Sequence, residues 1–174
     1  MAYDTALTVA LTTSASIWDH LTNLEQGSRA EGVLFFRTLK DWVTRSGITA
    51  LKFSPMADWD ANVDQIFDAI SNGATTLYGF YCDNSANTAQ SYVKMTNATA
   101  PTVGTTAPDI IVYIPGTTTG VVTGEGAYDD GRYYHLFVPG IRFATNLSSH
   151  VVTAAGTAGS TDPTSNVNGF IIHT

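Results

Sequence analysis

The stretch Leu77-Tyr78-Gly79-Phe80-Tyr81-Cys82 decides the fold, because from Ala74 onward the apolar pattern of the chain changes from a helical period to a period of two. A short run of aromatic and aliphatic residues of this kind is typical of a β-strand. The same pattern predicts further strands at Ser91–Met95, Ile110–Ile114, Tyr133–Val138, Ile141–Ala144, Val151–Ala154 and Phe170–His173. Residues 74–174 are therefore expected to form a β-domain.

Turn-forming residues separate these predicted strands. Clusters of Pro, Gly, Asn and Thr lie between them without a helical pattern, which favours an antiparallel sandwich or barrel. Pro139-Gly140 interrupts an apolar stretch and predicts either a tight turn or a bend at which a strand changes sheets. The neutral loops 99–108 and 156–166 do not resemble disordered linkers, and we expect them to be ordered against other structure. We expect an α+β protein, mainly β, with a jelly-roll-like antiparallel β-sandwich at residues 74–174.

Residues 1–73 mix an extended arm with helices. Thr5–Leu11 alternates at period two and predicts a short strand or docking arm. Ser28 and Glu31 have the spacing of a capping box, and Gly47 can end the helix that follows. The apolar positions of this helix recur near helical period, at Leu34, Phe35, Leu39, Trp42 and Val43. A buried strand over 32–39 is the rival interpretation, because residues 33–36 are a continuous apolar run.

A second helix is expected between Asp58 and Gly73. Asp58 or Asp60 can cap its N-terminus, and Asn72-Gly73 can end it. Its apolar stripe consists of Val63, Ile66, Phe67 and Ile70. Trp59, beside the cap, is expected to pack onto neighbouring structure. With the arm, these two helices make residues 1–73 a docking region.

The chain carries few charges: 13% of its 174 residues are Asp, Glu, Lys or Arg, against about 25% in ordinary globular proteins. From residue 74 to the end the charged residues are Asp83, Lys94, Asp109, Glu125, Asp129, Asp130, Arg132, Arg142 and Asp162. A free monomer usually keeps a mixed, charged surface, so we expect neighbouring subunits to cover much of this neutral one. A merely Thr-rich β-domain of the secreted type is the alternative.

Charge and cysteine content exclude several classes of partner. The formal net charge of -7, without a Lys/Arg cluster, disfavours nucleic-acid binding. The N-terminus lacks the pattern of a signal peptide, and no apolar run is long enough to span a bilayer, so we expect a soluble protein without a membrane partner. Cys82 is the only cysteine, which rules out an intrachain disulfide and fits folding in a reducing cytoplasm.

The usual catalytic and cofactor motifs are missing from the sequence. No G-x-S-x-G elbow is present, and the glycine-rich run 120–126 lacks the Lys-Ser/Thr pair of a phosphate loop. The histidines follow no zinc-ligand spacing, and they lie at His20, His135, His150 and His173. For His135 and His173 a hydrogen-bonded structural role is expected. We therefore expect no enzyme activity, no metal and no cofactor.

One acidic loop remains as a weak candidate for a binding site. Carboxylates on a loop can bind a hard cation such as calcium, although a solvated turn is the commoner structure for such a cluster. These acids are Glu125, Asp129 and Asp130. The tyrosines that flank the loop, Tyr128, Tyr133 and Tyr134, could stack on a sugar or contact a protein partner. A glycan- or receptor-binding β-sandwich module is accordingly the alternative function.

Several segments of the second half carry a family resemblance. Ala74–Tyr81 and Tyr92–Ala98 are followed by two more distinctive segments, residues 100–108 (APTVGTTAP) and 140–145 (GIRFAT). A Thr/Ala/Gly-rich loop at residues 155–161 and a last strand come after them. Together these segments, within residues 74–174, resemble small β-sandwich structural proteins from the virions and prophages of tailed bacteriophages. The sequence departs from that pattern at Val121–Tyr134, where a longer acidic loop is inserted.

The resemblance implies a virion structural protein, and head decoration, a head fibre or a neck- or tail-attached piece are all open. We expect a non-enzymatic assembly protein that is made in the host cytoplasm and ends in the virion. Its expected partners are further copies of itself, in a symmetric homo-oligomer, and other virion proteins such as a major capsid protein. Strand edges and neutral loops would contact identical neighbours, while the N-terminal arm or helices dock on a larger lattice.

Overall fold

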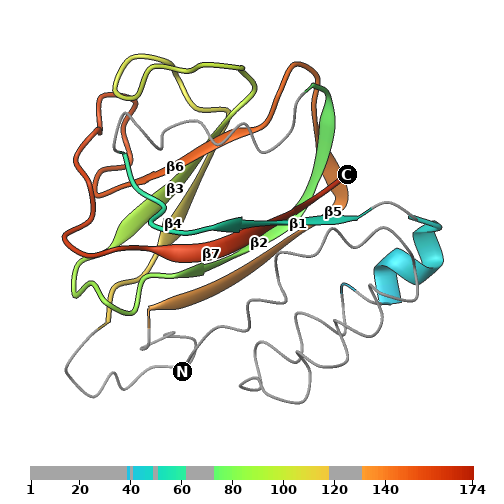
Figure 1. The fold of residues 1–174 in the computed structure, drawn as a ribbon, viewed down its shortest axis with the longest axis horizontal. Coiled ribbons are helices and arrows are strands. Elements are labelled where there is room, and N and C mark those ends of the chain that lie inside the picture. The colour runs from blue at the N-terminus through green and yellow to red at the C-terminus, as the bar shows by residue number, and fades with distance from the viewer. Residues whose placement is uncertain (1–38, 40, 49–50, 62–72, 118–130) are drawn as a thin grey trace.

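The structure, a computed structural model, describes residues 39, 41–48, 51–61, 73–117 and 131–174 (Figure 1). The described part is mainly β, with a short helical segment at residues 39 and 41–46. Its strands are β1 (Lys52–Met56), β2 (Thr75–Asp83), β3 (Ser91–Thr96), β4 (Ile110–Ile114), β5 (Arg132–Phe143), β6 (Ser148–Val152) and β7 (Asn168–His173).

The strands form two antiparallel sheets. The four-stranded sheet A has the order β1-β7-β2-β5, and the three-stranded sheet B has the order β4-β3-β6. All of the described pairings are antiparallel. The two sheets share one apolar core, which is the arrangement of a β-sandwich. The expectation of a mainly β, antiparallel fold is confirmed.

The core between the sheets forms because strands place alternate side chains inward. Its fully buried members include Leu77, Phe80 and Ile171 from sheet A and Val93, Met95 and Val151 from sheet B. The Phe80 ring meets aromatic rings from two other segments, with centroids 6.2 Å from Trp59 and 6.0 Å from Tyr133. Full burial of a side chain of this size contributes about 1.5–3 kcal/mol. The inward faces of the strands therefore hold the sheets together.

β5 is one continuous strand where the sequence analysis expected two. On β2, Gly79 pairs with Leu136 and Leu77 pairs with Ile141, so residues 137–140 bulge out opposite a single residue. The bulge contains the cis Val138–Pro139 peptide bond and Gly140, whose φ is 110°. The prediction of a tight turn or a change of sheet at Pro139-Gly140 is wrong, because both halves of β5 pair with β2.

The short helical segment confirms the end of the first predicted helix. Gly47 follows it with a φ of 63°, the left-handed conformation that commonly ends helices. Leu39 is helical and buried, whereas the rival interpretation placed it in a strand. Leu39 and Val43 pack against Tyr78 and Ile172, so this helix covers part of the outer face of sheet A.

β1 was not expected, because it is short and contains Pro55, which weakens a strand prediction. It pairs with β7 along its whole length, from Lys52 opposite His173 to Met56 opposite Gly169. A tertiary partner far along the chain is what makes this segment a strand. Residues before position 73 therefore contribute to the sandwich, and the division of the chain at residue 73 stays a prediction.

Trp59 packs onto neighbouring structure, as expected. Its side chain is buried against Phe80, and its backbone N–H donates a hydrogen bond to the Val167 oxygen at 2.6 Å. Several other predicted elements lie outside the described residues. These are the arm Thr5–Leu11, the first helix before residue 39 and the apolar stripe of the second helix, Val63 to Ile70.

Gly169→Ala tests the close approach of β7 to β2. A Cβ at position 169 would overlap the backbone oxygen of Tyr81 in the neighbouring strand, which cannot retreat without disturbing the β2–β7 pairing. We expect the free energy of unfolding in urea to fall by about 2 kcal/mol or more. Gly156→Ala is the matched control, because nothing lies within 4 Å of its added Cβ, and its effect should stay within about 0.5 kcal/mol. Equal effects of the two substitutions would contradict this packing.

Candidate functional site

The chain's own loops cover the part of the outer face of sheet B around Lys94. Lys94, in the middle of β3, is buried, and its Nζ donates hydrogen bonds to the backbone oxygens of Gly156 and Gly159 at 2.7 and 2.9 Å. The two neutral loops also meet each other, since a Cβ on Gly104 would touch the Ser160 side chain. Both loops are ordered against other structure, as expected, and that structure is this chain itself.

Lys94 has a buried histidine as its neighbour. His150 of β6 pairs with Lys94 across the sheet, and its Nδ1 is buried without a hydrogen-bond partner among the described residues. Burial, and then the Lys94 charge, lower the pKa of His150 from 6.5 to about 4. Burial also lowers the pKa of Lys94. At neutral pH His150 is therefore uncharged beside a lysine that is held by two carbonyl oxygens.

Two buried asparagines fasten one end of the sandwich. Asn84 Nδ2 donates hydrogen bonds to the backbone oxygens of Ala89 and Pro115, and Asn87 Nδ2 donates one to that of Ser165. The two amides also join each other, because Asn87 Nδ2 donates to Asn84 Oδ1 at 2.9 Å. Uncharged amides thus connect the β2–β3 loop to the segments after β4 and before β7.

Titratable groups near this end are engaged in the fold. Asp83 accepts hydrogen bonds from Arg132 Nε at 3.3 Å, from the Tyr81 hydroxyl at 3.2 Å and from the Ser85 backbone N–H at 3.0 Å. The neighbouring Cys82 is fully buried, and burial, together with the Asp83 charge, raises the pKa of its thiol. A protonated, enclosed thiol is unreactive.

Two histidines have the hydrogen-bonded structural role that was expected. The ring nitrogens of His173 lie 2.8 Å from the Ser54 hydroxyl and 3.2 Å from the Thr75 hydroxyl. His135 Nδ1 lies 3.2 Å from the Tyr133 hydroxyl. The His173 contacts join β7 to β1 and β2, and the His135 contact joins two positions on β5. Both imidazole rings are therefore held by hydrogen bonds within sheet A.

The structure separates the two predicted contact tyrosines that it describes. Tyr133 and Tyr134 are consecutive on β5, so their side chains point to opposite faces of sheet A. Tyr133 packs against the core between the sheets, and Tyr134 lies 4.6 Å from the Tyr81 ring on the outer face. Both are half-buried, and they do not form one stacking platform.

The predicted acidic loop lies outside the described residues. This applies to Tyr128 and to the weak metal candidates Glu125, Asp129 and Asp130. Among the residues that the structure does describe, no group of three or more His, Cys, Asp or Glu side chains could hold a metal ion. The metal and glycan interpretations of this loop stay predictions.

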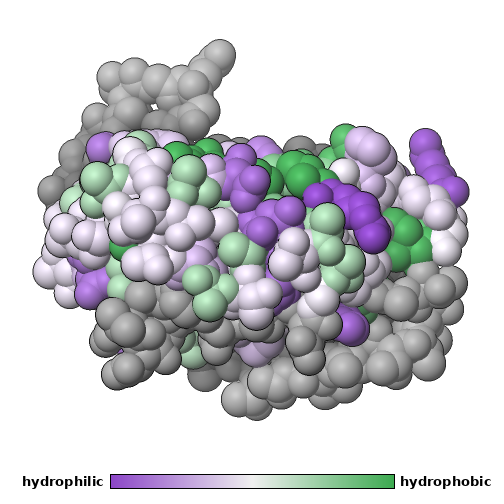
Figure 2. Space-filling model, turned by 90° about the horizontal axis from the view of Figure 1, so that it is seen from above, coloured by the Kyte–Doolittle hydropathy of each residue, from purple (hydrophilic) through white to green (hydrophobic). Residues whose placement is uncertain are grey.

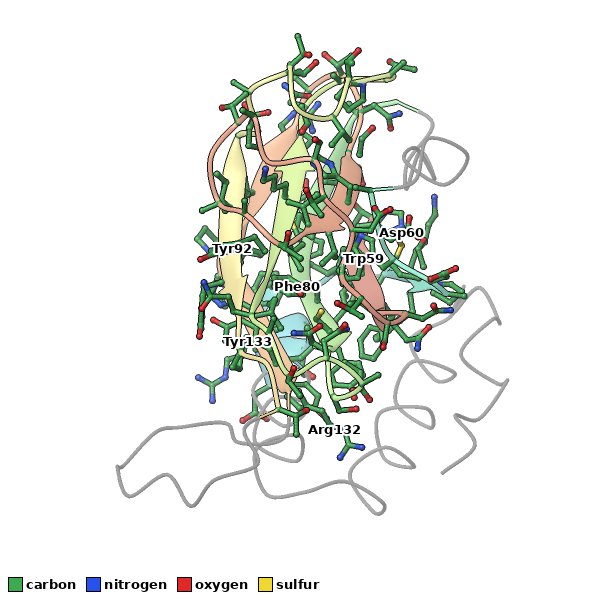
Figure 3. All side chains as sticks on the ribbon, turned by 90° about the vertical axis from the view of Figure 1, so that its left-hand side faces the viewer. Trp59, Asp60, Phe80, Tyr92, Arg132 and Tyr133 are labelled. Atoms are coloured by element: carbon green, nitrogen blue, oxygen red, sulfur yellow. The ribbon has the colours of Figure 1, made fainter. Side chains whose placement is uncertain are left out.

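The sandwich has two sides that differ. On one side the segment after β1 bridges the sheets, because Trp59 N donates to Val167 O next to β7 and Val151 N of β6 donates to Asp60 O. β4 and β5, the last strands at the other end of each sheet, form the opposite side. Figure 3 shows this separation, with Trp59 and Asp60 to the right and Tyr92 and Tyr133 to the left. We call the second one the β4–β5 side.

The β4–β5 side carries the large apolar side chains that are exposed in the described part of the chain. Ile111 and Tyr113 on β4 are 42% and 52% exposed, and Val138 and Ile141 on β5 are 56% and 36% exposed. The inward residues of the same strands are only half-buried against the core, namely Ile110, Val112, Tyr133 and Phe137. Exposed apolar side chains that gather on one side mark a candidate interaction surface.

The described residues from position 73 onward expose few charges. Residues 73–117 and 131–174 contain six charged side chains, of which Asp83 and Lys94 are buried. Those that reach solvent are Asp109, Arg132, Arg142 and Asp162. The face in Figure 2 is mainly pale, the colour of residues with intermediate hydropathy, with a few purple groups. These two ranges of the chain therefore expose fewer charges than the surface of a free monomer usually does.

Comparisons with known proteins found no match for this chain among protein-family models, curated proteins or solved structures. The resemblance to virion proteins of tailed bacteriophages therefore stays a prediction. Within the described ranges, no helix has both the length and the apolar character needed to cross a membrane.

The sequence analysis predicted the strand Ile110–Ile114 but not that it lies at the edge of a sheet. The observed bounds are the same as the predicted ones. Whether a strand lies at an edge depends on which distant segments pair with it, and the sequence alone did not reveal this. The sequence analysis also did not predict the burial of Lys94 or its contact with a loop. One signal was present, because Lys94 is the single charged residue in the strand Ser91–Thr96.

Because the pKa of buried His150 is low, we expect the folded protein to lose stability in weak acid. Its pKa is about 4 in the folded protein and near 6.5 in the unfolded chain, so between these values the unfolded state binds more protons. Stability should therefore fall as the pH drops from about 6.5 to 4, by up to about 3 kcal/mol from this residue.

Urea unfolding at pH 7 and pH 4.5, for the wild type and His150→Asn, measures this contribution. The variant should lose less stability than the wild type between the two pH values. Some loss of stability should remain in the variant, because burial also lowers the pKa values of His135 and His173. An equal loss in both proteins would show that His150 is not buried in its neutral form.

Proposed function

We propose that this chain is a non-enzymatic structural protein of a tailed-bacteriophage virion, and that it forms a symmetric homo-oligomer associated with the capsid, as a decoration or head-fibre component. The observation that carries the proposal is the group of exposed aromatic and aliphatic side chains on β4 and β5, in a chain in which only 13% of the residues are charged. An interface core is typically depleted in charge and contains aromatic and aliphatic residues, as β4 (Ile110–Ile114) does.

The covered faces narrow the choice of contact surface. The helical segment packs on the outer face of sheet A, and the loops around Gly104, Gly156 and Gly159 pack on sheet B. Part of the neutral surface that we expected neighbouring subunits to cover is therefore covered by the chain itself. Identical neighbours are left with the exposed apolar side chains of β4 and β5 as the surface for association.

We further infer a jelly-roll topology for the sandwich. In a jelly roll the strands B to I form sheets with the orders B-I-D-G and C-H-E-F. Sheet A (β1-β7-β2-β5) matches the first order, and β4-β3-β6 matches F-E-H of the second. The hydrogen bond from Val151 N to Asp60 O supports this topology, because strand C would follow β1 and lie beside β6. Many viral capsid domains have this fold, which is supporting analogy only, since lectins and cupins share it.

The wider assembly follows from the same proposal. The N-terminal arm and the two predicted helices would dock on a larger lattice, such as one of a major capsid protein. Many weak contacts then add through effective concentration, so each copy needs only a modest interface. Because the titratable groups described above are engaged in the fold, assembly rather than chemistry is the activity that we infer.

The proposal predicts an oligomer that tolerates salt. Raising NaCl from about 0.1 to about 1 M shortens the Debye length from roughly 10 to 3 Å, which would weaken an interface built on ion pairs. The association of chains of net charge -7 through an apolar interface should be as strong or stronger at the higher salt concentration, because salt screens the repulsion between the chains. Light scattering coupled to gel filtration measures the mass across both conditions. A monomer at every concentration and salt would contradict the proposal.

Virion association is tested on particles. An antibody raised against the purified protein should label intact particles of the phage whose genome encodes this chain. Immunogold electron microscopy detects this labelling. Particles made without the protein should bind it when it is added back, and should not bind an unrelated β-sandwich protein of similar charge. Absence of both labelling and add-back binding would place the protein outside the virion.

A further inference from the structure

Two sheets present four edge strands, and edge strands are sites at which another chain can add a strand. β1 is the first edge of sheet A. It carries Lys52, which is exposed, and Pro55, which has no N–H to donate to an added strand. Both are devices by which natural sheets prevent edge-to-edge pairing. β1 is thus a protected edge.

β5, the other edge of sheet A, is protected in a different way. Its bulge at residues 137–140 breaks the regular spacing of backbone groups, and Pro139 removes a donor. Arg132 and Arg142 place charges near both ends of the strand. A second strand could not pair along β5 in one register.

β6, one edge of sheet B, is closed by the chain. All five of its residues, Ser148–Val152, are buried, and Asp60 O accepts a hydrogen bond from Val151 N. This edge offers no exposed length for another strand.

β4 is the remaining edge, and among the described strands it alone is exposed and carries none of these devices. Its sequence, Ile110-Ile111-Val112-Tyr113-Ile114, contains no charge and no proline, and its register with β3 has no bulge. Tyr113 is 52% exposed, and its ring packs 5.8 Å from the Tyr92 ring, which gives it a supported position. A strand of this composition at a sheet edge is a template for pairing.

We propose that β4 pairs antiparallel with β4 of a second copy of this chain, about a two-fold axis that passes Val112 perpendicular to sheet B. The inference rests on the proposed function, and it names the surface, the partner and the register of the oligomer. Three strands from each copy would then form one continuous sheet.

The sequence of β4 is what selects a second copy as the occupant. A two-fold contact requires a patch that is complementary to itself. In the proposed register Val112 faces Val112 of the second copy, Ile110 faces Ile114, and Ile111 faces Tyr113. Aromatic and β-branched cross-strand pairs of this kind stabilise sheets. β4 contains no charged residue, so the two paired strands bring no like charges together, although the chain as a whole has a net charge of -7.

The test changes one exposed position on β4 and one on β5. Ile111→Glu puts a charge on the outward face of the proposed contact, next to buried Lys94 in the pairing with β3, and should leave the fold intact. We expect the dimer dissociation constant, from sedimentation equilibrium, to rise about tenfold or more. Val138→Glu adds the same charge at an exposed apolar position of β5 and asks whether the contact lies there instead; if β4 carries the pairing, dimerisation persists in this variant. Ala57→Glu, at an exposed position next to β1 on the opposite side of the sandwich, is the control for the added charge alone.

A charge pair tests the register itself. In the double variant Ile111→Glu/Tyr113→Lys, opposite charges face each other across the two-fold axis, so dimerisation should recover relative to Ile111→Glu alone. Ile111→Glu/Tyr113→Glu, in which like charges face each other, should not recover. Circular dichroism and urea unfolding identify any variant that fails to fold. In that case slower hydrogen exchange of residues 110–114 in the wild type at higher protein concentration supplies the same evidence.

The outcomes separate this inference from the proposed function. A wild-type oligomer that withstands Ile111→Glu, shows no rescue, or is a trimer without a two-fold contact overturns the β4 pairing and leaves the assembly proposal standing. An oligomer lost in Val138→Glu but not in Ile111→Glu places the contact on β5 and also overturns it. A wild type that is monomeric at all concentrations overturns both.

Discussion

The two sheets bury each other's inner faces around Phe80. Its ring meets Trp59 from the side where the segment after β1 bridges the sheets, and Tyr133 from the β4–β5 side. The other features of the described structure depend on that burial. It brings β1 and β7 together from distant parts of the chain, and it creates the outer faces on which the helical segment and the loops pack. With part of each outer face covered by the chain itself, the exposed apolar side chains of β4 and β5 remain as the surface at which the sandwich can meet another molecule.

Buried polar side chains connect distant segments of the described structure through hydrogen bonds to backbone oxygens. The amides of Asn84 and Asn87 connect three segments at one end, and the buried ammonium of Lys94 holds a loop through backbone oxygens. Such interactions are shielded from water and salt, so they do not require a charged surface. Among residues 73–117 and 131–174, few charged side chains reach solvent.

Protection of the strand edges is uneven, and this unevenness links the fold to the proposed assembly. Lys52 and Pro55 guard β1, a bulge with Pro139 guards β5, and burial closes β6. β4 is left with five apolar residues and an exposed tyrosine. Unprotected edges carry a risk of aggregation, and a symmetric partner strand removes that risk by satisfying the edge.

By itself the sequence determined the strands whose pattern is local, such as Leu77–Cys82 and Ile110–Ile114, and the helix end at Gly47, because periodicity and a left-handed glycine act over a few residues. Only the tertiary structure made Lys52–Met56 a strand and turned Pro139-Gly140 into a bulge, since both depend on a partner strand. It also decided that Lys94 is buried and that β4 lies at an edge. These properties arise from contacts between segments far apart in the chain, which no local pattern encodes.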